Sequence, residues 1–201
     1  MQNAIYEYGP GLYFNLTNKC PCECAFCVRA GAQGLGSAGS LWLSEEPTAA
    51  QVISQLADRE LAGYADLCFC GFGEPFCAFD TMLEICVYLK SRKNCPPVRV
   101  NTNGLGDLIN GRHTPPLLAG LVDVISISLN APTKERYTQL CRPEFGEGAF
   151  EAMLKFAREC TEHVPLVALS VVDVISPNEI AACQKIADGL GIPLRVRGFS
   201  G

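Results

Sequence analysis

The sequence has few of the features that mark membrane-bound, secreted or nucleic-acid-binding proteins. Its apolar runs are short, and none reaches the roughly eighteen residues that cross a bilayer. The first ten residues, MQNAIYEYGP, lack the basic and apolar stretches of a secretory leader. Positive charge is also scarce, because 16 Lys and Arg face 21 Asp and Glu, and the net charge of −5 does not suit binding to phosphate backbones. We therefore expect a cytoplasmic protein without membrane or nucleic-acid partners.

What remains is the composition of a globular protein with one unusual residue type. With 201 residues, 48% of them hydrophobic and 18% charged, the chain is expected to form a single domain over residues 1–201. Cysteine is the exception, with 12 residues, too few for a disulfide scaffold and without a secretion signal. These thiols should stay reduced and either pack as small apolar groups or bind metal. The two histidines, His113 and His163, have no partner at ligand spacing and are expected on the surface.

Strand-like and helix-like patterns alternate along the chain. The strand-like runs cover residues 11–17, 65–70, 98–103, 123–130, 166–173 and 194–197. Apolar residues at helical spacing follow Phe79 and Phe150, and the helix starts at Thr48 and Ser176 carry capping signals. The Gly-rich segment 31–39 is expected to be a flexible loop. Six β/α alternations predict an α/β fold with a parallel sheet.

The strands have one apolar and one polar face, which bears on how this sheet is shaped. In residues 123–130 the polar face carries Ser126, Ser128 and Asn130. Arg99, Asn101 and Asn103 share a face in residues 98–103, and so do Arg195 and Arg197 in the last strand. These patterns predict a partial, open (β/α)6 TIM-like barrel around a polar cavity, since the strands of a doubly wound sheet or closed barrel would be apolar there. The alternative is that some of them are solvent-facing edge strands.

A cluster of cysteines follows the first predicted strand. Cys20, Cys24 and Cys27 stand in the spacing C-x3-C-x2-C, with Cys22 between them. Three thiolates on one loop would leave one iron of a four-iron cluster open to an outside ligand. A structural zinc module on all four cysteines is the alternative from another class, although zinc sites usually use two separated pairs. A plain ferredoxin would need a further ligand and the C-x2-C-x2-C-x3-C-P run, which the loop lacks.

At this point the chain resembles the radical S-adenosylmethionine (SAM) superfamily. That family's signature is this cysteine triplet with an aromatic residue before the third cysteine, here Phe26. The sequence CGFGEP at residues 70–75 is similar to the family's Gly-Gly-Glu-Pro motif, although Phe72 replaces a glycine. Thr102-Asn103-Gly104 and Ser128-Leu129-Asn130 resemble its motifs at the ends of strands 3 and 4. The short chain looks most like the radical SAM proteins linked to TatD-family hydrolases.

The resemblance implies an enzyme with a [4Fe-4S] cluster on Cys20, Cys24 and Cys27 that reductively cleaves SAM. The 5′-deoxyadenosyl radical formed would abstract hydrogen from a substrate, an oxidoreductase-type reaction. The residues that the resemblance and the polar faces assign to SAM binding are Phe26, Gly71, Gly73, Glu74, Asn103, Ser128, Asn130, Arg195 and Arg197. The implied partners are a flavodoxin or ferredoxin as low-potential electron donor and a TatD-like hydrolase. A glycyl-radical-enzyme activase is the alternative within the class.

The other eight cysteines are scattered along the chain. They are Cys68, Cys70, Cys77, Cys86, Cys95, Cys141, Cys160 and Cys183. Because cysteine is often a small buried apolar residue, we expect these to be packing residues.

Overall fold

A computed structural model describes residues 4–30 and 39–199 of the chain. Within them, one sheet has the strand order β1-β2-β3-β4-β5-β6-β7. The strands are β1 (Ile5–Tyr8), β2 (Gly11–Phe14), β3 (Leu67–Phe69), β4 (Val98–Thr102), β5 (Val124–Ser128), β6 (Leu166–Val172) and β7 (Leu194–Arg197). β1 pairs antiparallel with β2, and the strands from β2 to β7 are parallel. The six predicted strands are confirmed, and β1 is an addition. Apart from Gly39, the predicted Gly-rich loop lies outside the described residues.

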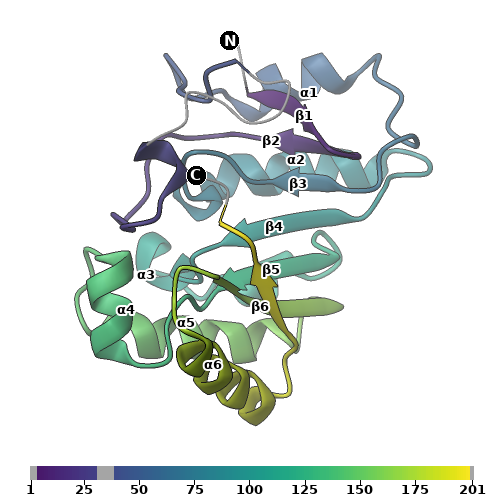
Figure 1. Ribbon diagram of the computed structural model, residues 1–201. Coiled ribbons are helices and arrows are strands. Elements are labelled where there is room, and N and C mark those ends of the chain that lie inside the picture. Colours follow the sequence, from purple (N-terminus) through teal and green to yellow (C-terminus); the bar gives the residue numbers. More distant parts are fainter. Residues whose placement is uncertain (1–3, 31–38, 200–201) are drawn as a thin grey trace.

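The helices follow the outer side of this sheet. They are α1 (Ala49–Leu56), α2 (Phe79–Ser91), α3 (Gly106–Asn110), α4 (Lys134–Cys141), α5 (Gly148–Cys160) and α6 (Pro177–Leu190). Short 3-10 turns form η1 (Val28–Ala30), η2 (Pro75–Ala78) and η3 (Pro115–Leu118). The sheet curves from β1 to β7, and β7 folds over in front of β5 (Figure 1). The result is the open, TIM-like barrel that the polar faces predicted.

The helix starts show why these segments fold as the sequence indicated. Thr48 and Gln51 form a capping box at the start of α1, and Ser176 and Glu179 form another at α6. Each box satisfies backbone N–H groups that have no partner inside the helix. None of the described helices is long and apolar enough to cross a membrane.

The two faces of β5 establish which side of the sheet is the core. Ile125, Ile127 and Leu129 are 0% exposed and belong to the apolar core between the sheet and the helices. Ser128 and Asn130 line a cavity on the opposite, concave side. Because β4 and β5 lie inside the sheet, the alternative of edge strands is wrong for them. It holds only for β7, which is an edge strand of the described sheet.

Candidate functional site

A cavity of about 600 Å³ occupies the concave side of the sheet. Its wall runs from the cysteines that follow β2 to the residues of β7, so it lies where the parallel strands end. All twelve site residues predicted from the sequence line this cavity: Cys20, Cys24, Cys27, Phe26, Gly71, Gly73, Glu74, Asn103, Ser128, Asn130, Arg195 and Arg197. The structure thus brings together segments that are up to 177 residues apart in sequence, from Cys20 to Arg197.

Residues 18–28, here called the cysteine loop, are positioned by the end of helix α4. The backbone N–H of Glu23 donates to the carbonyl of Cys141 over 3.0 Å, and that of Ala25 donates to Leu140 over 2.8 Å. These carbonyls are in the last turn of α4 and have no partner within the helix. The loop therefore caps the helix while the helix fixes the loop over the cavity. Helix α4 was not predicted individually, and no sequence signal indicated this contact.

The four cysteines of the loop differ in environment. Cys22 is buried at 2% exposure, and its sulfur accepts a 3.7 Å hydrogen bond from the side chain of Asn103. Cys20, Cys24 and Cys27 are only partly buried. Within the described residues, no three cysteine sulfurs lie within 4.8 Å of one another.

The surroundings of Cys20 and Cys24 favour their thiolates. A hydrogen bond from the Cys22 thiol lowers the pKa of Cys20 to about 7. A hydrogen bond from Cys141 is the main cause that lowers the pKa of Cys24 to about 4. The positive charge of Arg29 acts in the same direction on both. The thiolate is the form of cysteine that binds metal.

Arg29 is a residue of the site that the sequence analysis missed. Its guanidinium donates to the backbone carbonyls of Asn18 over 3.3 Å and Cys22 over 3.2 Å. It thereby ties the two ends of the cysteine loop together and places a positive charge beside the thiols. Its position two residues after the last cysteine of the triplet was the signal that could have identified it.

The segment from Gly71 to Glu74 packs directly on the chain that leads into the cysteine loop. The N–H of Glu74 donates to the carbonyl of Lys19 over 2.8 Å. A Cβ atom on Gly73 would lie 2.2 Å from the carbonyl oxygen of Thr17, so glycine is required by this close approach. Phe72, which replaces the family's glycine, is 3% exposed and packs edge-on against Trp42. The substitution therefore extends a small apolar cluster beside the cavity.

Glu74 connects the segment after β3 to the end of β4. Its carboxylate accepts hydrogen bonds from the Thr102 hydroxyl (2.6 Å), the Asn103 N–H (2.8 Å) and the Phe76 N–H (3.2 Å). Burial raises the pKa of Glu74 to about 8, and the negative charge of Cys20 adds to the effect. These hydrogen bonds occupy the carboxylate, so Glu74 positions the segment after β3 against the end of β4. The sequence did not predict this role.

The side chain of Asn130 has an unused polar atom beside the cavity. Its Nδ2 donates to the sulfur of Cys141 over 3.7 Å, but its buried Oδ1 has no partner among the described residues. The backbone has a positive φ of 57°, a conformation that asparagine tolerates better than most residues. An unsatisfied buried acceptor is uncommon and calls for a donor. The ammonium and ribose hydroxyl groups of SAM are donors of this kind, so this residue fits that cofactor.

A second group of polar side chains lines the cavity near β3, β4 and β7. The thiol of Cys70 lies near the thiol of Cys68 and near the side chains of Asn101, Arg99 and Arg197. A hydrogen bond with Cys68 is the main cause that lowers the pKa of Cys70 to about 6. Cys141 is 1% exposed and packs in the apolar core as predicted, and both it and Cys70 also border the cavity. The polar surroundings of Cys70 depend on the pairing of β3 with β4 and on the position of β7, which sequence spacing does not show. The cysteines that are fully buried as predicted, without lining the cavity, are Cys68, Cys86, Cys160 and Cys183.

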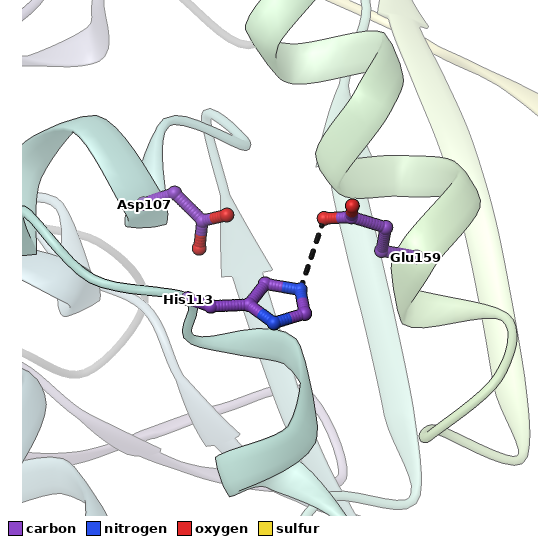
Figure 2. Close-up of side chains that lie close together, drawn as sticks. All are labelled: Asp107, His113 and Glu159. Atoms are coloured by element: carbon purple, nitrogen blue, oxygen red, sulfur yellow. Dashed lines mark hydrogen bonds and ion pairs between the residues drawn. The ribbon is translucent and has the colours of Figure 1, made fainter.

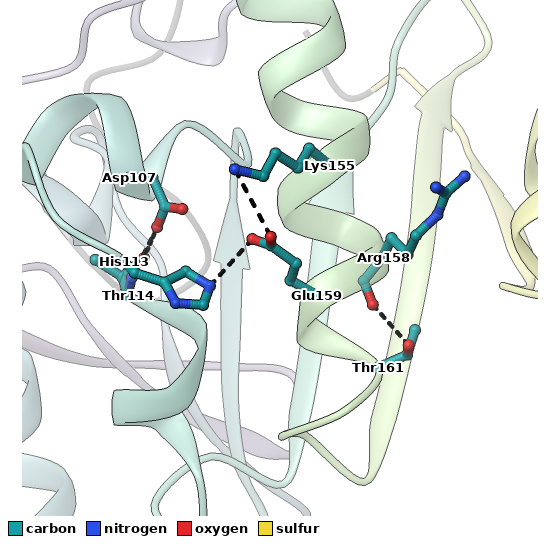
Figure 3. Close-up of polar contacts among 7 residues, drawn as sticks. All are labelled: Asp107, His113, Thr114, Lys155, Arg158, Glu159 and Thr161. Carbon is teal, nitrogen blue, oxygen red and sulfur yellow. Dashed lines mark hydrogen bonds and ion pairs between the residues drawn. The ribbon is translucent and has the colours of Figure 1, made fainter.

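A separate polar cluster lies outside the cavity, among the outer helices. Asp107 of α3, His113 and Glu159 of α5 point toward one another, with their ligand atoms within 4.8 Å (Figure 2). His113 is exposed, as expected, and its Nε2 lies 3.2 Å from the carboxylate of Glu159, which is 46 residues away in the sequence. Lys155 lies 3.7 Å from the same carboxylate, and Thr114 donates twice to Asp107 (Figure 3). Because both carboxylates have partners, we interpret this cluster as an ion-pair network.

The fold and the site together define an open α/β barrel with a cysteine loop on the wall of a cavity of mixed polar and apolar lining. A protein-family model described as the radical SAM superfamily matches residues 14–182. The chain therefore belongs to the radical SAM superfamily. Its members are enzymes that use a [4Fe-4S] cluster and SAM, and they generally take electrons from flavodoxin or ferredoxin. No curated protein sequence matches the chain.

Solved structures of this superfamily share the fold at low sequence identity. The chain is similar to Streptococcus suis SuiB bound to S-adenosylmethionine, with a TM-score of 0.64 and 16% identity over 94% of this chain and 38% of that one. It is also similar to a radical SAM methyltransferase from Sphaerobacter thermophilus, with a TM-score of 0.63 and 16% identity over 98% of this chain and 69% of that one. For HydG, a maturase of the [FeFe]-hydrogenase, the TM-score is 0.67 and the identity 16%, over 98% of this chain and 44% of that one. The chain thus spans less than half of two of these proteins.

Proposed function

We propose that this protein is a radical SAM enzyme of the oxidoreductase type, whose cluster is held by Cys20, Cys24 and Cys27. The observation that carries the proposal is the position of these three partly exposed thiols at the mouth of the polar cavity. Cys22 is left out because it is buried and accepts a hydrogen bond from Asn103. Cluster and SAM, when bound, supply one-electron chemistry that ends in the abstraction of a hydrogen atom from the substrate.

The residues of the chain would bind and orient these groups. The backbone of the segment from Gly71 to Glu74 borders the cysteine loop, where the methionine end of SAM would lie. The free Oδ1 of Asn130 would accept a hydrogen bond from SAM, and Ser128 adds a hydroxyl to the same wall. Phe26 and Asn103 complete this part of the cavity. Enclosure in the barrel would keep water away from the reacting atoms.

We further propose that a flavodoxin or ferredoxin reduces the cluster, and that a TatD-like hydrolase is a functional partner. The TatD link is supported only by the sequence likeness of the short chain and its cysteine loop. Addition of a candidate TatD-like hydrolase should then change the amount of 5′-deoxyadenosine formed in a reduced reaction mixture. An unchanged amount would overturn this link and leave the enzyme class untouched.

The proposal is tested by anaerobic reconstitution with iron and sulfide. We expect a brown protein with about four iron atoms per chain that bleaches with dithionite. SAM should change the electron paramagnetic resonance spectrum of the reduced protein, because a ligand then binds the cluster. Zinc in place of iron, or a spectrum that SAM does not alter, would contradict the proposal. The Cys86→Ala variant, altered in a buried core cysteine of α2, is the matched control that should retain both signals.

A further inference from the structure

Arg197 has a polar atom that the fold leaves without a partner. It is the last residue of the edge strand β7, and its side chain lines the cavity. The guanidinium Nε is buried and has no hydrogen-bond partner among the described residues. Within the same residues, Arg197 forms no ion pair with a carboxylate. A buried arginine nitrogen in this state calls for an acceptor, because burial has removed the water that would otherwise satisfy it.

Arg99, which lines the same cavity, has hydrogen-bond partners for its guanidinium. Arg99 donates from Nε to Asp66 over 2.7 Å, from Nη1 to Asn101 over 2.9 Å and from Nη2 to Tyr13 over 3.0 Å. Asp66 thus neutralises Arg99 and is not shared with Arg197. The two arginines line the same cavity, but among the described residues only Arg99 forms an ion pair with a carboxylate.

Arg197 has charged neighbours of both signs, Cys70 on one hand and Arg195 and Arg99 on the other. Burial lowers the pKa of Arg197, the negative charge of Cys70 opposes this, and repulsion from Arg195 and Arg99 lowers the pKa further. Arg195 lines the same cavity and likewise has no carboxylate partner among the described residues. A bound anion would remove the repulsion and supply the missing acceptor.

We infer that Arg197 binds an oxyanion, a carboxylate or a phosphate group, of the substrate. The inference rests on the proposed function and specifies its substrate class. The cysteine loop has a positive charge of its own in Arg29, whose guanidinium acts on Cys20 and Cys24. Arg197 acts instead on Cys70, after β3. Arg29 and Arg197 are therefore two separate positive charges, one beside the cysteine loop and one on the cavity wall, where it can serve a second anionic group.

The body of the substrate would meet an apolar rim. Phe199, Val196 and Tyr8 line the cavity and are 52%, 48% and 43% exposed. Such side chains suit the apolar portion of a ligand whose charged group is held by the arginine. The substrate class is thus a molecule that joins an oxyanion to an apolar or aromatic portion.

The test measures anion binding to the reconstituted protein at saturating SAM. Inorganic phosphate and acetate are titrated separately against chloride at equal ionic strength, and binding is followed by thermal stabilisation and calorimetry. We expect at least one of them to bind, and Arg197→Gln to weaken it tenfold or more while the Kd for SAM changes less than twofold. Arg158→Gln on the exposed surface of α5 removes the same charge away from the cavity and should leave the affinity unchanged. Arg197→Lys keeps the charge but loses the planar fork, so its anion affinity should lie between those of the wild-type protein and Arg197→Gln. This variant replaces Arg197→Gln in the test if the glutamine variant does not fold.

Three results would overturn the inference. The first is that neither anion binds the wild-type protein. The second is that both anions bind Arg197→Gln as tightly as the wild-type protein. Alternatively, Arg197→Gln weakens SAM instead, and SAM competes with the anion, which would assign the guanidinium to the cofactor's carboxylate. Failure of the proposed function is seen separately, because a protein without iron or SAM binding is identified before any anion is added.

Discussion

The carboxylate of Glu74 and the hydroxyl of Thr102 are joined by a 2.6 Å hydrogen bond that links the segment after β3 to the end of β4. The same carboxylate accepts from the N–H of Asn103. Glu74→Ala should leave these donors unpaired and lower the free energy of unfolding by about 1–3 kcal/mol. Glu74→Gln keeps one acceptor oxygen, so its free energy of unfolding should fall by a smaller amount. Urea denaturation of the metal-free protein measures both, with the exposed Glu151→Ala as control. Equal stability of all three variants would show that Glu74 does not join the strands.

The buried position of Cys22 predicts which cysteine substitutions remove the cluster. Cys24→Ala should abolish the iron chromophore, and so should the same change at Cys20 or Cys27. Cys22→Ala should retain iron, because this sulfur is held under the loop by Asn103. Iron content and the visible spectrum after reconstitution measure the difference. Loss of iron in Cys22→Ala together with retention in Cys24→Ala would refute the assignment.

The contact between Gly73 and Thr17 predicts that a single methyl group disturbs the cysteine loop. In Gly73→Ala the new Cβ would lie 2.2 Å from the Thr17 carbonyl oxygen, and the backbone must move. Both iron content and SAM affinity should therefore fall. Gly63→Ala is the matched control, since nothing lies within 4 Å of its Cβ position. If only SAM affinity fell, Gly73 would be needed for the cofactor and not for the loop.

The surroundings of Cys70 predict a reactive thiol in the cavity. Its pKa is about 6 instead of 9.0, so its thiolate should dominate at neutral pH. Since the folded pKa is the lower one, the group adds stability that is complete above pH 9.0 and is lost as the pH falls through about 6. Iodoacetamide labelling of the metal-free protein, read by mass spectrometry, should reach half its maximum near that lower pH. Arg197→Gln should raise this midpoint, because a stabilising positive charge is lost. A midpoint near 9.0 in the wild-type protein would contradict the prediction.

Sequence periodicity was sufficient for the elements whose two faces differ strongly. The alternation in residues 123–130 placed Ile125 and Ile127 in the core and Ser128 beside the cavity, as found. The helix α2 was equally clear, because five apolar residues recur at helical spacing and are buried: Phe79, Met82, Ile85, Cys86 and Leu89. Strand β1 was missed because four residues between polar and turn-forming neighbours carry little pattern.

The contacts that complete the site depend on distances between elements, which periodicity does not contain. Cys141 reaches the cysteine loop from a helix whose sequence, KERYTQLC, is mostly polar. It has only two buried residues, Tyr137 and Cys141, so its apolar pattern is weak. His113 and Glu159 meet across 46 residues of chain. The local spacing of ligand residues gave no indication of either contact.

The position of β7 at the edge of the sheet also bears on aggregation. An edge strand offers backbone groups with which another chain could pair, and short or charged edges discourage this. β7 has four residues, and two of them are the arginines that line the cavity. The same charges that await an anion therefore also keep neighbouring molecules from adding a strand at this edge. Loss of both Arg195 and Arg197 would expose it to self-association, so a variant that removes only one of them preserves solubility better.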